Sequence, residues 1–174
     1  TSRRWEYDSL GRATAMIDEA GARWTTVYDA IGNPIATIDP NGNRTDTTYD
    51  AMRRAVATTD AVGNTSAQVY NAAGLLASST DALGNVTSYL YDVMGRLVGM
   101  TLPDGATTSV AYDANGHVAS ETDARGFSTA YEYDALGRQT AQVDALGGRT
   151  MARYDAAGNL TSSTDALGNE TTYA

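Results

Sequence analysis

The chain has 174 residues, of which 42% are hydrophobic and 19% are charged, and it contains 17 Gly, 11 Tyr and no Cys. No apolar run approaches the roughly 20 residues that a membrane-spanning helix needs, and the absence of Cys excludes a disulfide framework and a thiolate metal site. The formal net charge of -9 makes nucleic acid an unfavourable partner, because a phosphate backbone would be repelled.

Internal repetition dominates the sequence. Tyr recurs every 21 residues through eight units, at Tyr7, Tyr28, Tyr49, Tyr70, Tyr91, Tyr112, Tyr133 and Tyr154. Asp follows this Tyr except at Asn71, and Gly comes three residues after that position except at Arg53. A second Asp and a second Gly recur in the same frame, with Leu102 as the only substitution of that Asp. We therefore predict one array of eight 21-residue repeats over residues 1–174.

Each unit contains the pattern Asp-x-x-Gly twice. Asp at the first position of a type I turn accepts hydrogen bonds from backbone amides, and Gly at the fourth position adopts a positive φ without a Cβ clash. Such a turn is a common hairpin connection. In chain order, turns are predicted at residues 8–11, 18–21, 29–32, 39–42, 50–53, 60–63, 71–74, 81–84, 92–95, 102–105, 113–116, 123–126, 134–137, 144–147, 155–158 and 165–168. We expect a positive φ at both Gly84 and Gly168.

The segments between the turns are short and rich in Thr, Val and Tyr, as residues 85–91 and 96–101 illustrate. Turns this close together leave no room for a helix of three turns. The 16 predicted turns connect about 17 strands, too many for a flat open sheet, and a closed barrel of that size would enclose an unfilled lumen. We therefore predict an all-β fold in which antiparallel β-hairpin repeats form a curved, spiralling ribbon.

The strands lack the continuous apolar face that a two-layer sandwich requires. Residues 78–80 and 161–164 consist entirely of Ser and Thr. Buried hydroxyl groups without partners cost about 1–3 kcal/mol each, so we expect one face to border water or cargo rather than a dry core. The Tyr column from Tyr28 to Tyr154 is expected to lie at equivalent sites, substantially buried against neighbouring strands, because regularly spaced rings form cross-strand ladders.

A weaker period of 42 residues is superimposed on the repeat. The residue after the first Gly position is Arg in alternate units, at Arg12, Arg54, Arg96 and Arg138. The intervening units carry Asn33, Leu75, His117 and Asn159 at this position. One explanation is that alternate hairpins have different neighbours as the ribbon coils.

Residues 91–96 (Tyr-Asp-Val-Met-Gly-Arg) and 133–138 (Tyr-Asp-Ala-Leu-Gly-Arg), with second turns such as residues 81–87, resemble the YD-repeat (RHS-repeat) family. The resemblance covers the whole chain. Members of this family form β-strand shells that spiral into a hollow cocoon. Bacterial members are typically parts of polymorphic toxins, type VI effectors and insecticidal toxin complexes that enclose a toxic C-terminal domain, and animal teneurins use a similar shell in adhesion. The resemblance implies encapsulation or scaffolding, with no chemistry within the repeats.

Bacterial shells of this family usually end with an Asp-Pro-x-Gly segment beside an aspartyl autoprotease. Residues 39–42 match that segment superficially, but they occupy the ordinary second turn of their unit, and six further repeats follow. Pro40 is a favoured residue at the second position of a type I turn, so we interpret these residues as a turn. Because the array begins and ends without caps, we expect it to be a piece of a longer protein.

Several residues could suggest a site. The repeated Asp residues are isolated in the sequence, whereas a calcium loop clusters its carboxylates. His117, the only His, has no nucleophile motif nearby, and we interpret it as a polar strand residue. Asn-x-Ser/Thr sequences follow from turn and strand preferences at Asn43, Asn64, Asn85, Asn159 and Asn169. We predict no catalytic, cofactor-binding or metal-ligating residue, and no cofactor.

The leading interpretation is a non-enzymatic β-shell segment that encapsulates or scaffolds a toxin or effector cargo, in a protein that is secreted or delivered to a cell surface. The expected partners are the enclosed C-terminal toxin or effector domain, the remaining shell repeats of the parent protein, or a second copy of the chain. Neither nucleic acid nor membrane insertion is expected. The alternative is an extracellular adhesive or carbohydrate-binding array whose exposed aromatic rings would stack on sugars; an enzyme is the least favoured class.

Overall fold

The computed structural model describes residues 2–173 as β-strands joined by short loops, and this range contains no helix. The strands are β1 (Arg4–Tyr7), β2 (Ala13–Ile17), β3 (Arg23–Tyr28), β4 (Pro34–Ile38), β5 (Arg44–Tyr49), β6 (Ala55–Thr59), β7 (Thr65–Tyr70), β8 (Leu76–Thr80), β9 (Val86–Tyr91), β10 (Leu97–Thr101), β11 (Thr107–Tyr112), β12 (Val118–Thr122), β13 (Ser128–Tyr133), β14 (Gln139–Val143), β15 (Arg149–Tyr154), β16 (Leu160–Thr164) and β17 (Glu170–Thr172). The all-β class and the 17 strands predicted from the turns are confirmed. Accordingly, nothing in residues 2–173 could cross a membrane as a helix.

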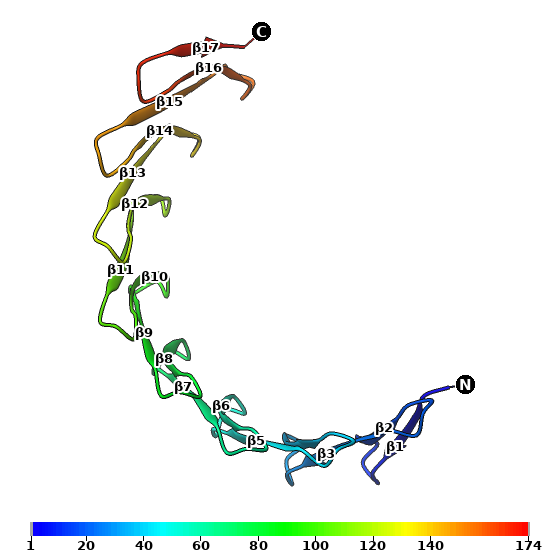
Figure 1. Cartoon of the computed structure of the whole chain (residues 1–174). Coiled ribbons are helices and arrows are strands. Elements are labelled where there is room, and N and C mark those ends of the chain that lie inside the picture. The colour runs from blue at the N-terminus through cyan, green and yellow to red at the C-terminus, as the bar shows by residue number, and fades with distance from the viewer. Residues whose placement is uncertain (1, 174) are drawn as a thin grey trace. The chain divides into compact units, whose positions relative to one another are not determined.

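The strands form an open antiparallel meander, because hydrogen-bonded partners are consecutive in the chain. The chain divides into two compact units, residues 1–87 and residues 88–174. Within the first unit, β1 to β8 follow one another in a single layer; within the second, β10 to β17 do the same (Figure 1). In the described part of each unit, contacts between strands join neighbours in sequence, so neither unit has a second layer packed on its sheet.

The turns have the local geometry that Asp-x-x-Gly predicts. The Gly84 N–H donates to the Asp81 carbonyl at 3.0 Å, and the Asp81 N–H donates to the Asn85 carbonyl at 3.0 Å. The Asp81 carboxylate also accepts from the backbone N–H groups of Leu83 and Asn85, each at 2.9 Å. The φ angle is 85° at Gly84 and 86° at Gly168, which confirms the positive values predicted for both residues.

Each hairpin that is closed by a Tyr-Asp turn contains a β-bulge, which the sequence did not predict. In the β3–β4 hairpin, Tyr28 pairs with Pro34 and Val27 pairs with Ala36, so Ile35 is an extra residue on β4. The hairpins closed by the second turn of each unit have no such shift, as the β4–β5 register shows. A bulge bends the strand that carries it and increases the local twist. One bulge per repeat therefore twists the sheet of each unit at regular intervals.

The two faces of the sheet carry different side chains. We call the face that bears the Tyr column the Tyr face. It is rich in hydroxyl groups, in cross-strand rows such as Thr26–Thr37–Thr45 and Thr47–Thr58–Ser66. The opposite face has small residues at its centre, including Ala15, Ala36 and Ala141. Hydroxyl groups on a sheet face are stable in contact with water, so the Tyr face does not require a covering layer.

No compact core spans the two faces in residues 2–173. The only buried hydrophobic residues in this range are Ala15, Ala36 and Ala141, and no large side chain is fully buried. Large apolar residues are instead exposed at the tips of the loops, where Leu83 is 87% exposed. The absence of a two-layer core in the described residues agrees with the prediction from the hydroxylated strands.

Candidate functional site at the repeat junctions

The Tyr column joins successive repeats within each of the two units. The Tyr112 hydroxyl donates to the Leu97 carbonyl, 15 residues earlier, at 3.1 Å. The same bond links Tyr28 to Ala13, Tyr49 to Pro34, Tyr70 to Ala55, Tyr133 to Val118 and Tyr154 to Gln139. Every Tyr of the column from Tyr28 to Tyr154 is half-buried and none is exposed, so the seven side chains are equivalent in burial, as predicted, and each retains some contact with solvent.

An Arg completes the junction in alternate repeats. The Arg96 guanidinium lies over the Tyr112 ring, with its Cζ 4.1 Å from the ring centroid, a cation–π geometry. Its Nε donates to Asp92 Oδ2 at 2.7 Å. Hydrogen bonds from the Arg96 backbone N–H, and then from its guanidinium, lower the pKa of the Asp92 carboxyl. This Asp-Arg-Tyr junction recurs at Asp8–Arg12–Tyr28, Asp50–Arg54–Tyr70 and Asp134–Arg138–Tyr154.

The units without Arg place a smaller residue in the same position. Asn33 Nδ2 donates to Asp29 Oδ2 at 2.8 Å. His117 Nδ1 lies 3.0 Å from Asp113 Oδ2, and its ring stacks on Tyr133 with the centroids 4.7 Å apart. His117 is therefore a junction residue just before β12 rather than a strand residue. The Arg units and the His117 unit thus contact the ring of the next Tyr. That alternate hairpins have different neighbours as the ribbon coils stays a hypothesis.

The repeated carboxylates are engaged by their own turns. Asn85 Nδ2 donates to Asp81 Oδ2, and the Asn residues of all five Asn-x-Ser/Thr sequences make the same bond at 2.7–2.9 Å. Residues 39–42 form a turn, as interpreted, with a φ of 86° at Gly42. Among residues 2–173, no group of three or more His, Cys, Asp or Glu is placed to hold a metal ion. That the chain has no catalytic or cofactor-binding residue stays a prediction.

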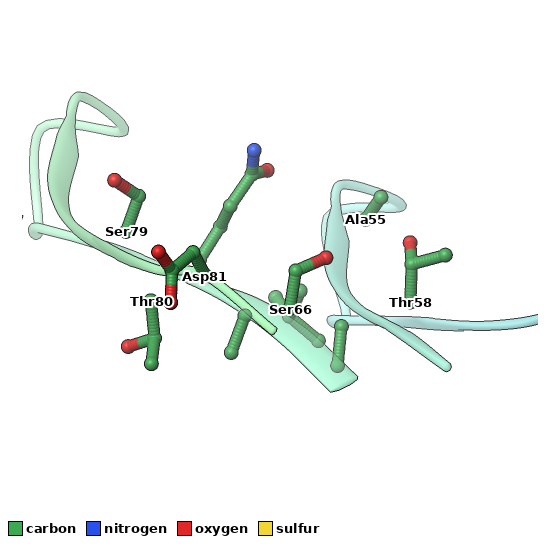
Figure 2. A pocket seen from close by; sticks show the side chains of 10 residues that line it. Ala55, Thr58, Ser66, Ser79, Thr80 and Asp81 are labelled. Carbon is green, nitrogen blue, oxygen red and sulfur yellow. The ribbon is translucent and has the colours of Figure 1, made fainter. Parts of the chain in front are cut away.

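Shallow grooves lie on the sheet, and they recur with the repeat. One groove in the first unit has a volume of about 320 Å³ and is lined by residues 55–58, 66–68 and 79–81. Figure 2 shows the Thr58, Ser66 and Ser79 side chains on one side of the sheet and Thr80 on the other. A groove of the same volume in the second unit is lined by residues 139–142, 150–152 and 163–165, two 42-residue periods further along. Because the groove recurs with the sequence period, we attribute it to the repeat rather than to a specialised pocket.

The sequence shows the Asp, Arg and Tyr columns separately and does not show the contact between them. Arg96 and Tyr112 belong to successive hairpins, and the same spacing separates each Arg from the Tyr of the next unit. That constant spacing is the feature of the sequence that could have indicated the contact. It identifies a contact only when the register of the strands between the two residues is known.

We predict that Tyr112→Phe destabilises the chain by about 0.5–1.5 kcal/mol, because it removes the hydrogen bond to Leu97 and retains the ring under Arg96. The measurement is the urea midpoint at pH 7. The control is Tyr7→Phe, since Tyr7 is 62% exposed at the start of the column and is expected to change the midpoint less. Equal losses in the two variants would argue against the junction.

The chain was compared with protein-family models, and the match follows the same repeat as the Tyr column. The family model described as RHS Repeat matches residues 28–65, 70–107, 112–149 and 154–174, so each match begins at a Tyr of the column and successive matches begin 42 residues apart. No curated protein matches the sequence.

Two solved structures share the fold. The crystal structure of TcdB2-TccC3 has a TM-score of 0.68 and 21% identity, covering 98% of this chain and 11% of that chain. The crystal structure of TcdB2-TccC3-TEV has a TM-score of 0.51 and 17% identity, covering 99% of this chain and 13% of that chain. The chain thus spans a small part of each of those proteins, and the likeness concerns the fold alone.

Proposed function

Because the chain belongs to the RHS repeat family, we propose that it is a wall segment of a larger RHS-repeat protein and that the wall encloses or supports a toxin or effector cargo. Its action is steric, since hydrogen-bonded strands separate the cargo from its surroundings. The observation that carries the proposal is the single-layer sheet, in which only three hydrophobic residues of 2–173 are buried. A layer of this kind has two faces, and a container wall uses one toward its contents and one toward the outside.

The repeat junctions suit a wall. A single sheet layer has no core to hold it rigid, so its stiffness depends on contacts between consecutive hairpins. The Tyr112 hydroxyl and the Arg96 guanidinium tie one hairpin to the next on the Tyr face, and the pattern recurs along each unit. These contacts resist bending of the sheet without filling the space beside it.

The proposal includes the partners and the setting of the parent protein. The partners are the remaining repeats of the shell and an enclosed C-terminal toxin or effector domain, and the parent protein is secreted or delivered to a cell surface. The wall itself is non-enzymatic. This part of the proposal is supported by the turn carboxylates, which are engaged in the hydrogen bonds of their own turns, as at Asp81 and Asp92.

A second candidate, carbohydrate binding, is favoured by one local feature. Trp5, Met16 and Trp24 pair across β1, β2 and β3 on the Tyr face, and Trp5 and Trp24 are 50% and 38% exposed. Flat aromatic rings at this exposure could stack on sugar rings. A glycan array probed with the chain and with Trp24→Ala separates the two functions, because a wall segment should show no glycan signal that depends on Trp24.

The wall function is tested by protease protection of the C-terminal domain in the parent protein. Deletion of residues 70–111 removes one 42-residue period and keeps the repeat in phase. We expect the deletion to make the C-terminal domain sensitive to protease, because the wall becomes too short to enclose it.

The matched control replaces residues 70–111 with a second copy of residues 112–153, which preserves the wall length, and it should leave the domain protected. A C-terminal domain that is digested in the intact parent as fast as the isolated domain would contradict the proposal.

A further inference from the structure

The loops at one rim of the first unit carry a row of exposed apolar side chains. Leu10, Ile31 and Met52 occupy the third position of consecutive Tyr-Asp turns, in the β1–β2, β3–β4 and β5–β6 hairpins. They are 73%, 58% and 72% exposed. We call the loops at residues 8–12, 29–33 and 50–54 the Tyr-turn rim. Consecutive loops are two strands apart, so the three side chains follow one another at intervals of about 10 Å.

The turn itself does not require an apolar residue at this position. The backbone N–H of Leu10 donates to the Asp8 carboxylate at 2.9 Å, and that of Asn115 donates to Asp113 at 2.8 Å in an equivalent turn. The hydrogen bond is the same whatever side chain the residue carries, and Asn115, Ala73 and Ala157 show that polar and small residues fit. The turn conformation therefore does not explain why large apolar residues occupy this position along the Tyr-turn rim, and we attribute them to a contact that the rim makes.

The turn amides and Asp carboxylates of the Tyr-turn rim are paired within their own loops, which lowers the cost of removing water from these groups. In the first loop the Gly11 N–H donates to the Asp8 carbonyl at 3.0 Å, and the Asp8 N–H donates to the Arg12 carbonyl at 2.9 Å. Arg12 Nε donates to Asp8 Oδ2 at 2.6 Å. Burial of such a loop leaves few unsatisfied donors or acceptors.

Charge distinguishes the two rims of the first unit. On the Tyr-turn rim, the formal charges of Arg12, Arg53 and Arg54 balance those of Asp8, Asp29 and Asp50. The loops of the opposite rim, at residues 18–22, 39–43, 60–64 and 81–85, carry five acidic residues and no Arg. Like charges repel across an interface, so two copies of this acidic chain meet with least repulsion where both present the neutral rim.

We propose that the Tyr-turn rim, residues 8–54, is the surface through which two copies of this chain associate, rim against rim. A row of knobs with even spacing is complementary to itself, because the knobs of one row fit the intervals of the other when the two rows run antiparallel. That arrangement is isologous and closes as a dimer. The inference does not depend on the proposed function.

The test is sedimentation velocity of the whole chain over a range of concentrations up to 100 µM. We expect the unchanged chain to form dimers. The triple variant Leu10→Asn, Ile31→Asn, Met52→Asn should dimerise at least tenfold more weakly, and its circular dichroism spectrum should be unchanged, because Asn115 already fits this turn position. The matched control is Val62→Asn, Leu83→Asn on the acidic rim, which should dimerise like the unchanged chain.

Five results would overturn the proposal. One is an unchanged chain that stays monomeric at 100 µM. A second is a control variant, Val62→Asn, Leu83→Asn, whose dimer is weakened as much as that of the triple variant. A third is a triple variant that remains dimeric. Loss of the dimer in Thr172→Pro would show that the copies pair through the free edge of β17, since the Tyr173 N–H already bonds Thr161 on β16. The last is a monomer that floats with phosphatidylcholine vesicles. If the triple variant no longer floats with them, the Tyr-turn rim binds lipid rather than a second copy.

Discussion

Acidification from pH 7 to pH 2.5 is expected to unfold the chain. The pKa of the Asp81 carboxyl is lowered, mainly by the hydrogen bond from the Asn85 side chain and then by backbone N–H groups. The same direction holds for most of the repeated turn carboxyls, including those of Asp39, Asp60 and Asp165. A carboxyl whose folded pKa lies below its unfolded value adds stability above the unfolded value, and this stability is lost as the pH falls through the folded pKa.

The acid effect is large because the same turn recurs along the whole chain. Each turn that loses its carboxylate weakens two backbone hydrogen bonds, as Asp81 would with Leu83 and Asn85. Protonation also leaves the positive charges of the Arg residues unbalanced, which adds repulsion. We expect the urea midpoint to fall steadily below about pH 5.

The measurement is a series of urea titrations followed by circular dichroism between pH 7 and pH 2.5. The matched variant is Asp60→Asn, Asp81→Asn. It should remain folded, because Asn71 supports an equivalent turn by accepting from the N–H groups of Ala73 and Leu75, each at 3.0 Å. The variant should lose less of its midpoint on acidification than the unchanged chain. A midpoint that is constant or rises as the pH falls would show that the turn carboxylates do not hold the fold.

Gly84→Val is expected to destabilise the chain by more than about 1 kcal/mol, because a β-branched residue is especially poor at a positive φ. Gly84 has a φ of 85°, and a Cβ added there would meet no atom within 4 Å. The cost therefore arises from the backbone conformation and not from crowding. The measurement is the urea midpoint at pH 7.

Two controls separate backbone strain from other effects of the substitution. Gly84→Asn should cost less than Gly84→Val, since Asn tolerates the left-handed region. Arg53 occupies the equivalent position with a φ of 61°, so Arg53→Gly should stabilise the chain by about 1 kcal/mol. If Gly84→Val and Gly84→Asn have the same effect, backbone strain is not the cause.

The sequence alone was sufficient to place the turns and strands. Asp81 and Gly84 shape their turn through atoms that lie within five residues of each other, so the residue types by themselves determine the local conformation. Because the pattern recurs at a constant spacing, the strand count and the antiparallel meander follow from it. The hydroxyl-rich strands likewise indicated that no dry core joins the two faces.

The junctions between repeats could be recognised only in the tertiary structure. The contact of Arg96 with Tyr112, and the bond from Tyr112 to Leu97, depend on the register of β9 to β11 and on the bulge in the β9–β10 hairpin. A shift of one residue in that register would turn the Tyr ring to the other face. The sequence supplies the columns of Asp, Arg and Tyr, whereas the pairing of the strands decides which members of those columns meet.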